Sequence, residues 1–223
     1  MSGDHPPNFV PAAGFRRLTA LYDPVLSAIM RERSWKSWLV ERVSPQPGQR
    51  ILDLGSGTGT LTLMLQQACP GAEIIGVDAD PDVIARARAK AVQTGVTPAF
   101  QRSRIDELDL VPAFGVASFD TIVSSLVFHH LNREAKRRAL INVVTLLRPG
   151  GMMHVADWGQ PDTTLMRLLF YPVQALDGFA NTADNLKGLL PQFMREAGLQ
   201  EVHEIRRVAT AFGSLSFYEG VRP

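Results

Sequence analysis

The chain has 223 residues, 45% of them hydrophobic, and its 23 lysines and arginines nearly balance its 22 aspartates and glutamates. At roughly 100–200 residues per domain this length predicts one domain with extensions, and a core of that size needs neither disulfides nor a structural metal. The single cysteine, Cys69, excludes a disulfide framework and a cysteine-cluster metal site, and the net charge of +1 argues against a non-specific nucleic-acid binder.

Targeting signals are not visible in the sequence. Residues 1–11 lack the basic-then-apolar order of a signal peptide. No apolar run approaches the roughly 20 residues that span a bilayer. We therefore expect a cytoplasmic protein.

The first predicted elements are helical. Residues 15–43 carry apolar side chains at spacings of three and four, which is the helical period. Pro24 divides this segment into two predicted helices. A cluster of Pro45, Pro47 and Gly48 closes the segment before the pattern changes.

Short apolar strands then alternate with helices. We expect strands at 50–54, 73–77, 97–102, 119–124 and 152–157, and helices at 60–68, 80–94 and 132–147. This alternation, with a period near 25 residues, predicts βαβ units and a mainly parallel sheet. The charged run at 133–138 within the last of these helices indicates a solvated helix face.

The C-terminal part follows a different pattern. Residues 163–176 and 182–197 have helical spacing, the second with an interruption at Pro191. Two strands at 201–209 and 214–221 follow, joined by a short turn. Strands connected in this way should be antiparallel.

The most informative stretch is 51–60, where three glycines alternate as Gly55-Ser56-Gly57-Thr58-Gly59. It follows the first strand, at the carboxyl edge where open α/β sheets bind ligands, and glycines let backbone approach a ligand closely. The spacing differs from the G-x-G-x-x-G dinucleotide fingerprint, because position 60 is threonine. Asp53 at the strand end suits a ligand ammonium and would repel a pyrophosphate, so the pattern favours a zwitterionic amino-acid ligand.

A second carboxylate ends the next strand. Asp78 lies 23 residues after Gly55, where it is placed to accept two hydrogen bonds from ribose hydroxyls. Asp80 precedes Pro81 and is better explained as a helix N-cap. Simple capping is also the alternative interpretation of Asp78.

Four segments in combination resemble a known family. They are ILDLGSGTG at 51–59, GVDAD at 76–80, FDTIVSSLVFHHL at 119–131 and LLRPGGMMHVADW at 146–158. Together they resemble the class I S-adenosylmethionine-dependent methyltransferases, and are most similar to the small-molecule branch that includes the ubiquinone/menaquinone C-methyltransferases. The resemblance covers roughly residues 18–223.

This resemblance implies a fold and a division of the chain. The fold is α/β, a Rossmann-like three-layer sandwich with a seven-stranded, mostly parallel sheet whose last strand is antiparallel. Residues 1–45 would form an N-terminal tail and helical lid. Residues 46–223 would form the methyltransferase domain, with an insert at about 159–182.

The resemblance also implies a cofactor site for S-adenosylmethionine, with S-adenosylhomocysteine as the product. The residues that would bind the cofactor are Asp53, Gly55, Ser56, Gly57, Gly59, Asp78, Ala79, Ile105 and Ser124. The family's Gly-Asp-Ala after the third strand is replaced here by Ser103-Arg104-Ile105. The adenine contact therefore falls to Asp106, to a backbone group or to apolar packing.

Methyl transfer from S-adenosylmethionine requires few catalytic side chains. Methyl transfer from a sulfonium is an in-line displacement, which mainly requires alignment and the exclusion of water. If the acceptor must lose a proton, His129 or His130 is the candidate catalytic base; alternatively, the pair only builds the turn after the fourth strand. We expect no metal.

Three aromatic residues are candidates for the substrate pocket: Tyr22, Trp158 and Tyr171. Tyr22 lies in the predicted N-terminal lid, Trp158 follows the fifth strand, and Tyr171 lies in the insert. For each of them, ordinary packing against a helix is the alternative.

The leading interpretation is methyl transfer to a small molecule that is quinone-like, aromatic, an amine or a lipid metabolite. Residues 124–127 lack the Asn/Asp-Pro-Pro-aromatic motif of amino-methylating nucleic-acid enzymes, so we expect no nucleic-acid partner, and membrane contact at most peripheral. An NAD(P)-dependent reductase is disfavoured by the glycine spacing and by the lack of a Tyr-x-x-x-Lys pair. A non-catalytic cofactor-binding module stays open because of Ser103-Arg104. The sequence indicates no particular oligomeric state.

Overall fold

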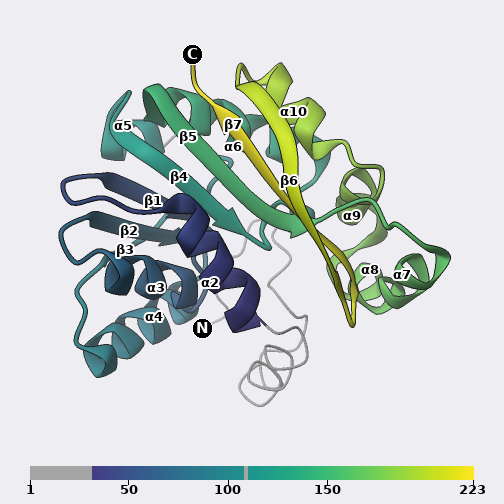
Figure 1. The fold of residues 1–223 in the computed structure, drawn as a ribbon, viewed down its shortest axis with the longest axis horizontal. Helices are drawn as coiled ribbons and strands as arrows, with labels where there is room; N and C mark the ends of the chain where they lie inside the picture. The colour runs from purple at the N-terminus through teal and green to yellow at the C-terminus, as the bar shows by residue number, and fades with distance from the viewer. Residues whose placement is uncertain (1–31, 108–109) are drawn as a thin grey trace, which may run out of the picture.

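A seven-stranded sheet forms the centre of the molecule, whose computed structural model describes residues 32–107 and 110–223 (Figure 1). The strands are β1 (Arg50–Leu54), β2 (Glu73–Asp78), β3 (Ala99–Arg102), β4 (Phe119–Ser125), β5 (Leu147–Trp158), β6 (Gln200–Thr210) and β7 (Gly213–Val221), in the order β3-β2-β1-β4-β5-β7-β6. Neighbours among β1 to β5 are parallel, and β7 is antiparallel to both β5 and β6. The predicted Rossmann-like fold with an antiparallel last strand is confirmed.

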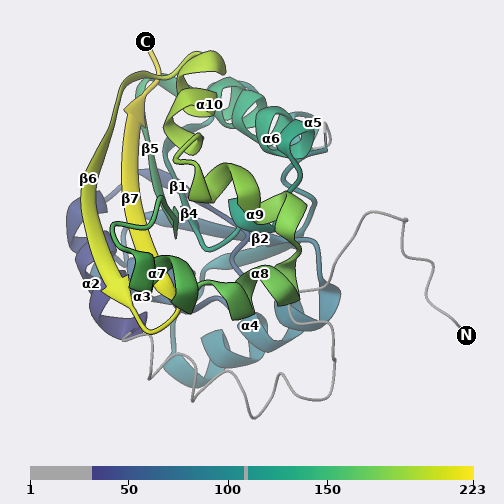
Figure 2. The same cartoon turned by 90° about the vertical axis from the view of Figure 1, so that its right-hand side faces the viewer.

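Helices cover both faces of the sheet and one of its ends (Figures 1 and 2). One face carries α2 (Glu32–Val43), α3 (Thr60–Ala68) and α4 (Pro81–Thr94), and the other carries α5 (Leu110–Phe114), α6 (Arg133–Leu146) and α10 (Leu190–Glu196). At one end of the sheet lie α7 (Thr164–Leu169), α8 (Tyr171–Asp177) and α9 (Phe179–Leu186), with the short 3₁₀ turn η1 (Phe128–His130). None of the described helices is long and apolar enough to cross a membrane.

The strands are apolar on both sides because both faces are covered. Ile51 and Ile74 belong to a core with Trp35 and other residues of α2 and α3, whereas the next residues, Leu52 and Ile75, belong to the core on the α6 side. Successive side chains of a strand point to opposite faces. Buried parallel strands therefore read as continuous apolar runs, as the sequence showed.

The observed helix ends follow the capping chemistry. Asp80 accepts a hydrogen bond from the backbone N–H of Asp82 at 2.8 Å, which confirms its predicted role as N-cap. Asn132 caps α6 in the same way through Ala135. One expectation about α6 was wrong, since Lys136 within the predicted solvated run is fully buried and its ammonium donates to the carbonyl of Asn181.

The C-terminal helices are shorter than predicted. The expected helix at 163–176 is two helices that meet at Phe170, and Pro172 lies in the first turn of the second one. Pro191 likewise begins α10 and does not interrupt a longer helix. Proline lacks an N–H, which the first turn of a helix does not need, so the first turn is where proline is tolerated.

Strand β5 begins five residues earlier than expected. The predicted helix end at 148–151 lies within β5, with left-handed backbone at Gly150, and Leu147 already pairs with Phe119 across a register shift. The N–H of Gly150 donates to the carbonyl of Arg222, and the N–H of Arg222 donates to the carbonyl of Gly151. The C-terminal residues thus supply the hydrogen bonds that keep this stretch in the sheet.

Helix α2 is attached to the sheet by a buried carboxylate. Glu219 on β7 is 2% exposed and accepts from Arg42 at 2.5 and 2.6 Å, while His154 Nδ1 lies 3.0 Å from Glu219 Oε1. Burial alone would raise the pKa of Glu219, but the hydrogen bonds from His154 and Arg42 lower it to about 2. The described part of the predicted N-terminal lid therefore packs on one face of the sheet, and its role as a lid stays a prediction.

We predict that Glu219→Gln lowers the free energy of unfolding at pH 7 by about 1–3 kcal/mol, the scale of a lost charged hydrogen bond. Because the pKa of Glu219 is lowered in the folded state, its contribution is complete above its ordinary pKa and is lost as the pH falls toward 2. Urea unfolding of both proteins at pH 7 and pH 3 checks this. A difference between them that does not shrink at pH 3 contradicts the assignment.

Candidate functional site

The carboxyl ends of the parallel strands β2, β1 and β4 lie next to one another at one edge of the sheet. β1 and β4 are neighbours, and the chain leaves them toward opposite faces, which makes this the switch point where open α/β sheets bind ligands. The hydroxyl of Ser124 donates to the carbonyl of Leu54 at 2.9 Å, so the two strand ends are held together. The glycine loop after β1 and the turn after β4 thus lie side by side.

All three glycines of the loop have left-handed backbone, with φ of 73° at Gly55, 53° at Gly57 and 76° at Gly59. A Cβ at Gly55 would collide with the side chain of Val127, and one at Gly59 would collide with Phe100. A Cβ at Gly57 would meet nothing within 4 Å. Gly57 is therefore the glycine beside which the structure leaves room for a ligand.

Asp78 holds the glycine loop from the end of β2. Its carboxylate accepts from the N–H of Gly57 at 2.9 Å and from the N–H of Asp80 at 3.0 Å. Burial raises its pKa, against the effect of these hydrogen bonds. Each carboxylate oxygen has two acceptor sites, so Asp78 can support the loop and still accept from ligand hydroxyls.

Asp53 is fully buried and only partly satisfied. One oxygen accepts from the Thr62 hydroxyl at 2.6 Å, whereas no described residue donates to Oδ1. Burial raises the pKa of Asp53 to about 6, against the hydrogen bond from Thr62 and the charge of Lys36. The buried hydroxyl of Ser56, in the same loop, also has no partner in the described part of the chain. Buried polar atoms without partners are rare, and these two fit a ligand that brings a cationic donor.

The predicted adenine neighbours lie further along the same edge. Ala79 is half-buried, and its carbonyl accepts from Arg102 at 3.3 Å. Ile105 is buried in the core on the α6 side. Asp106, the candidate for the adenine amino contact, lies 3.1 Å from Arg104 and 3.4 Å from Arg138. An adenine contact through Asp106 would compete with two guanidinium groups.

A buried carboxylate organises the turn after β4. Asp157, at the end of β5, accepts from His129 Nδ1 at 2.7 Å and from the N–H groups of Val127, His129 and Trp158. Leu126, just before this turn, has a φ of 57°, which is costly for a residue with a Cβ. The bonds to Asp157 keep the turn in this strained form.

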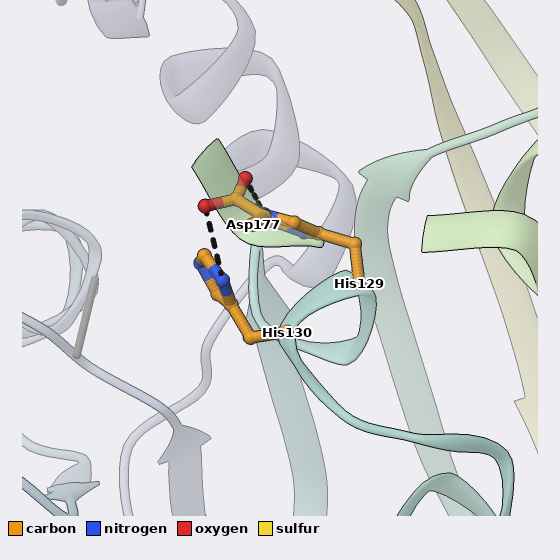
Figure 3. A group of neighbouring side chains, drawn as sticks. All are labelled: His129, His130 and Asp177. Carbon is orange, nitrogen blue, oxygen red and sulfur yellow. Dashed lines mark ion pairs between the residues drawn. The ribbon is translucent and has the colours of Figure 1, made fainter. Parts of the chain in front are cut away.

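A second carboxylate reaches the two histidines from α8 (Figure 3). Asp177 lies 3.5 Å from His129 Nε2 and 3.5 Å from His130 Nδ1. Burial opposes a charge on His129, but Asp157 and Asp177 outweigh it and raise the pKa of His129 to about 9. Burial and the neighbouring His129 lower the pKa of His130 to about 4. Both carboxyl pKa values are lowered because the histidines outweigh burial.

The candidate pocket residues have different surroundings. Trp158 is 4% exposed and packs edge-on against Phe170, with ring centroids 5.2 Å apart, and against His129 at 6.2 Å. Tyr171 is 48% exposed beneath the guanidinium of Arg167. Tyr22 lies outside the described residues. The structure therefore places Trp158 beside the histidine pair and Tyr171 on the surface of the insert.

Two carboxylates of the histidine cluster had no assigned role in the sequence analysis. Asp157 precedes Trp158 at a strand end, a position that could have indicated a ligand-edge function. Asp177 gives no such signal, because it is one acid in an apolar insert, 47 positions from His130. Only the folded chain brings them together.

The sequence is similar to a known protein family and to several curated proteins. Residues 51–151 match a family model described as a methyltransferase domain. This part of the chain is therefore similar to that family. A demethylmenaquinone methyltransferase from Thermus thermophilus is 33% identical over 136 residues, 61% of this chain and 59% of the relative. A ubiquinone/menaquinone biosynthesis C-methyltransferase from Cereibacter sphaeroides is 26% identical over 162 residues, 69% of this chain and 60% of the relative.

A solved structure of an S-adenosylmethionine-dependent methyltransferase from Thermotoga maritima superposes with a TM-score of 0.68 at 17% identity, covering 93% of this chain and 97% of that one. The predicted resemblance to this class is therefore confirmed, and the structural likeness supports the fold. The chain spans about six tenths of the length of the two named curated relatives. The residues matched by the family model include the glycine loop, Asp53 and Asp78.

We predict that Gly55→Ala destabilises the fold more than Gly57→Ala does. Both variants force alanine into left-handed backbone, at about 1–2 kcal/mol each. Gly55→Ala adds the collision with Val127, at about 1–3 kcal/mol. Urea unfolding measures the difference, and Val127→Ala should restore part of the loss in Gly55→Ala. Equal destabilisation by the two glycine variants contradicts the packing described.

Proposed function

We propose that this protein transfers a methyl group from S-adenosylmethionine to a small, largely apolar acceptor. The observation that carries this proposal is the buried Oδ1 of Asp53, which has no donor among the described residues and lies beneath the glycine loop. An amino-acid ammonium would supply the missing donor. A methyl donor built on methionine offers such an ammonium, and the matched methyltransferase domain includes Asp53.

Each part of the loop has a proposed task toward this cofactor. Asp53 binds the ammonium, and the open backbone at Gly57 allows close approach of the methionine portion. Asp78 accepts from the ribose hydroxyls through the acceptor sites left free by Gly57 and Asp80. Ser124 positions the end of β4 against this loop by its bond to Leu54. Ala79 and Ile105 stay predicted neighbours of the adenine.

The sulfonium supplies an activated methyl group when the cofactor is bound. The protein then has to align the acceptor with that methyl group and keep water away. Trp158 and Phe170 form a buried apolar wall beside the turn that carries the histidines. A role of His129 or His130 as proton acceptor stays a prediction.

An apolar acceptor fits the surface of the insert. Eight large apolar side chains are exposed among the described residues, and five of them lie on α7, α8 and α9: Leu165, Leu168, Tyr171, Leu176 and Phe179. Contiguous exposed apolar patches mark binding surfaces, and Tyr171 and Phe179 of this set pack edge to face with ring centroids 6.4 Å apart. Two relatives are named for methylation in menaquinone or ubiquinone biosynthesis. We therefore propose a quinone-like or other aromatic metabolite as the acceptor.

The reductase alternative is less consistent with the site. A dinucleotide pyrophosphate would be placed against the strand-end carboxylates, and a buried Asp53 would repel it. The non-catalytic alternative predicts cofactor binding without turnover. It is distinguished by incubating the protein with labelled methyl donor and a panel of quinols, phenols and amines.

We predict that calorimetry detects binding of S-adenosylmethionine and S-adenosylhomocysteine, and none of NADPH. Asp78→Asn should weaken binding of S-adenosylhomocysteine by about 1–3 kcal/mol, because buried hydrogen bonds to the ribose are lost. Asp80→Asn is the matched control, since this neighbouring acid only caps α4 and asparagine also caps well. The absence of binding by either sulfur compound refutes the proposal, and equal effects of the two variants refute the ribose assignment.

We also predict that affinity for S-adenosylhomocysteine falls below pH 6, by up to tenfold per pH unit. The pKa of Asp53 is about 6 in the free protein, and the ligand ammonium favours the charged carboxylate. Binding therefore releases a proton when the pH is below this pKa and none when it is well above. The charged groups that act on Asp53 are Lys36 on α2 and Asp78 on β2. Titrations from pH 5 to 8 measure the slope, which should disappear in Asp53→Asn.

A further inference from the structure

The cluster of His129, His130 and Asp177 brings three groups that can ligate a metal ion close together. One donor atom from each residue can be chosen so that all of them lie within 4.8 Å of one another. The carboxylate of Asp177 is 3.5 Å from a ring nitrogen of each histidine. In a tetrahedral zinc site with bonds of about 2.0–2.1 Å, neighbouring ligand atoms are about 3.4 Å apart. The contact to His129 uses Oδ2 of Asp177 and the contact to His130 uses Oδ1, so the carboxylate approaches each histidine through a separate oxygen, at a distance close to that value.

The outer contacts of His129 supply the second, independent observation. Its Nδ1 is 2.7 Å from the fully buried Asp157, which leaves Nε2 directed toward Asp177. Histidines that ligate metals usually donate their other ring N–H to a carboxylate or carbonyl, which fixes the ring and the tautomer. Asp157 is in turn fixed by three backbone N–H groups. Outer support of this kind is present before any ion binds.

Access and chain position also suit an ion site. His129 is buried, but the side chains of His130 and Asp177 are 26% and 13% exposed, so solvent reaches the cluster beside these two residues. The histidines come from η1 after β4, and the carboxylate comes from α8 in the insert (Figure 3). An ion would therefore join the sheet edge to the insert that carries the apolar surface.

We propose that His129, His130 and Asp177 bind a divalent transition-metal ion of the zinc, iron(II) or cobalt(II) class, with Asp157 as the outer support of His129. Two imidazoles and one carboxylate suit these ions and leave coordination positions open. The sequence alone predicts no metal. The third ligand becomes visible only when α8 folds against η1.

The site would lie beside the methyl donor. Val127 packs against Gly55 of the glycine loop, and His129 follows two residues later on the same turn. An ion here would polarise an oxygen of the acceptor and favour its deprotonated form. Binding of the ion does not depend on the proposed function, whereas this role in acceptor binding rests on it.

The test uses the full chain after removal of metals with a chelator. We expect about one equivalent of Zn²⁺ to bind in calorimetry, and Co²⁺ to give visible absorption bands that Zn²⁺ abolishes. His130→Ala and Asp177→Asn should each weaken binding at least tenfold. Asp157→Asn should weaken it by about 10–100-fold, as outer-shell substitutions do. His203→Ala is the matched control, because His203 is an exposed histidine on β6 and should have no effect.

Three results would overturn the proposal. The first is no binding of Zn²⁺ or Co²⁺ by the wild-type chain. The second is equal binding by the wild type and by the His130→Ala variant. The third is a loss of turnover in His130→Ala without any metal bound to the wild type, which would make His130 a proton acceptor instead. Binding of S-adenosylhomocysteine, measured on the same samples, verifies that the variants fold and tests the proposed function separately.

Discussion

The buried carboxylate of Asp157 is the interaction on which the arrangement of the site depends. It receives three backbone N–H groups and the imidazole of His129, so it joins the end of β5 to the turn after β4. Just before that turn, Leu126 has left-handed backbone, a conformation that needs such compensation. The same turn places the side chain of Val127 directly against Gly55. One carboxylate therefore positions both the histidine cluster and one wall of the glycine loop.

The two halves of the site use buried acids in opposite ways. Asp157 is saturated with donors, and its pKa is lowered despite burial. Asp53 has one oxygen to which no described residue donates, and its pKa is raised because burial prevails. A saturated carboxylate stabilises the fold, whereas an unsaturated one costs stability until a ligand supplies a donor. This contrast separates the supporting residue from the binding residue without reference to any relative.

Much of this architecture could be predicted from local patterns. The strands before and after the glycine loop, the cap at Asp80 and the antiparallel tail follow from apolar period, turn residues and strand order, which are local signals. The break between α7 and α8 was missed, although Pro172 marked it. The burial of Lys136 and the approach of Asp177 to His130 were not predictable, because they depend on how α8 and α9 pack against the sheet edge. Contacts between distant segments carry no periodic signal in the sequence.

A crystal structure of the protein with S-adenosylhomocysteine tests the central claim most directly. The account predicts that the ligand ammonium lies within hydrogen-bond distance of Asp53 Oδ1, about 2.7–3.2 Å, with the ribose hydroxyls on Asp78 and the backbone of Gly57 beside the methionine portion. A ligand bound elsewhere, or bound at this loop with Asp53 Oδ1 still without a donor, would contradict it.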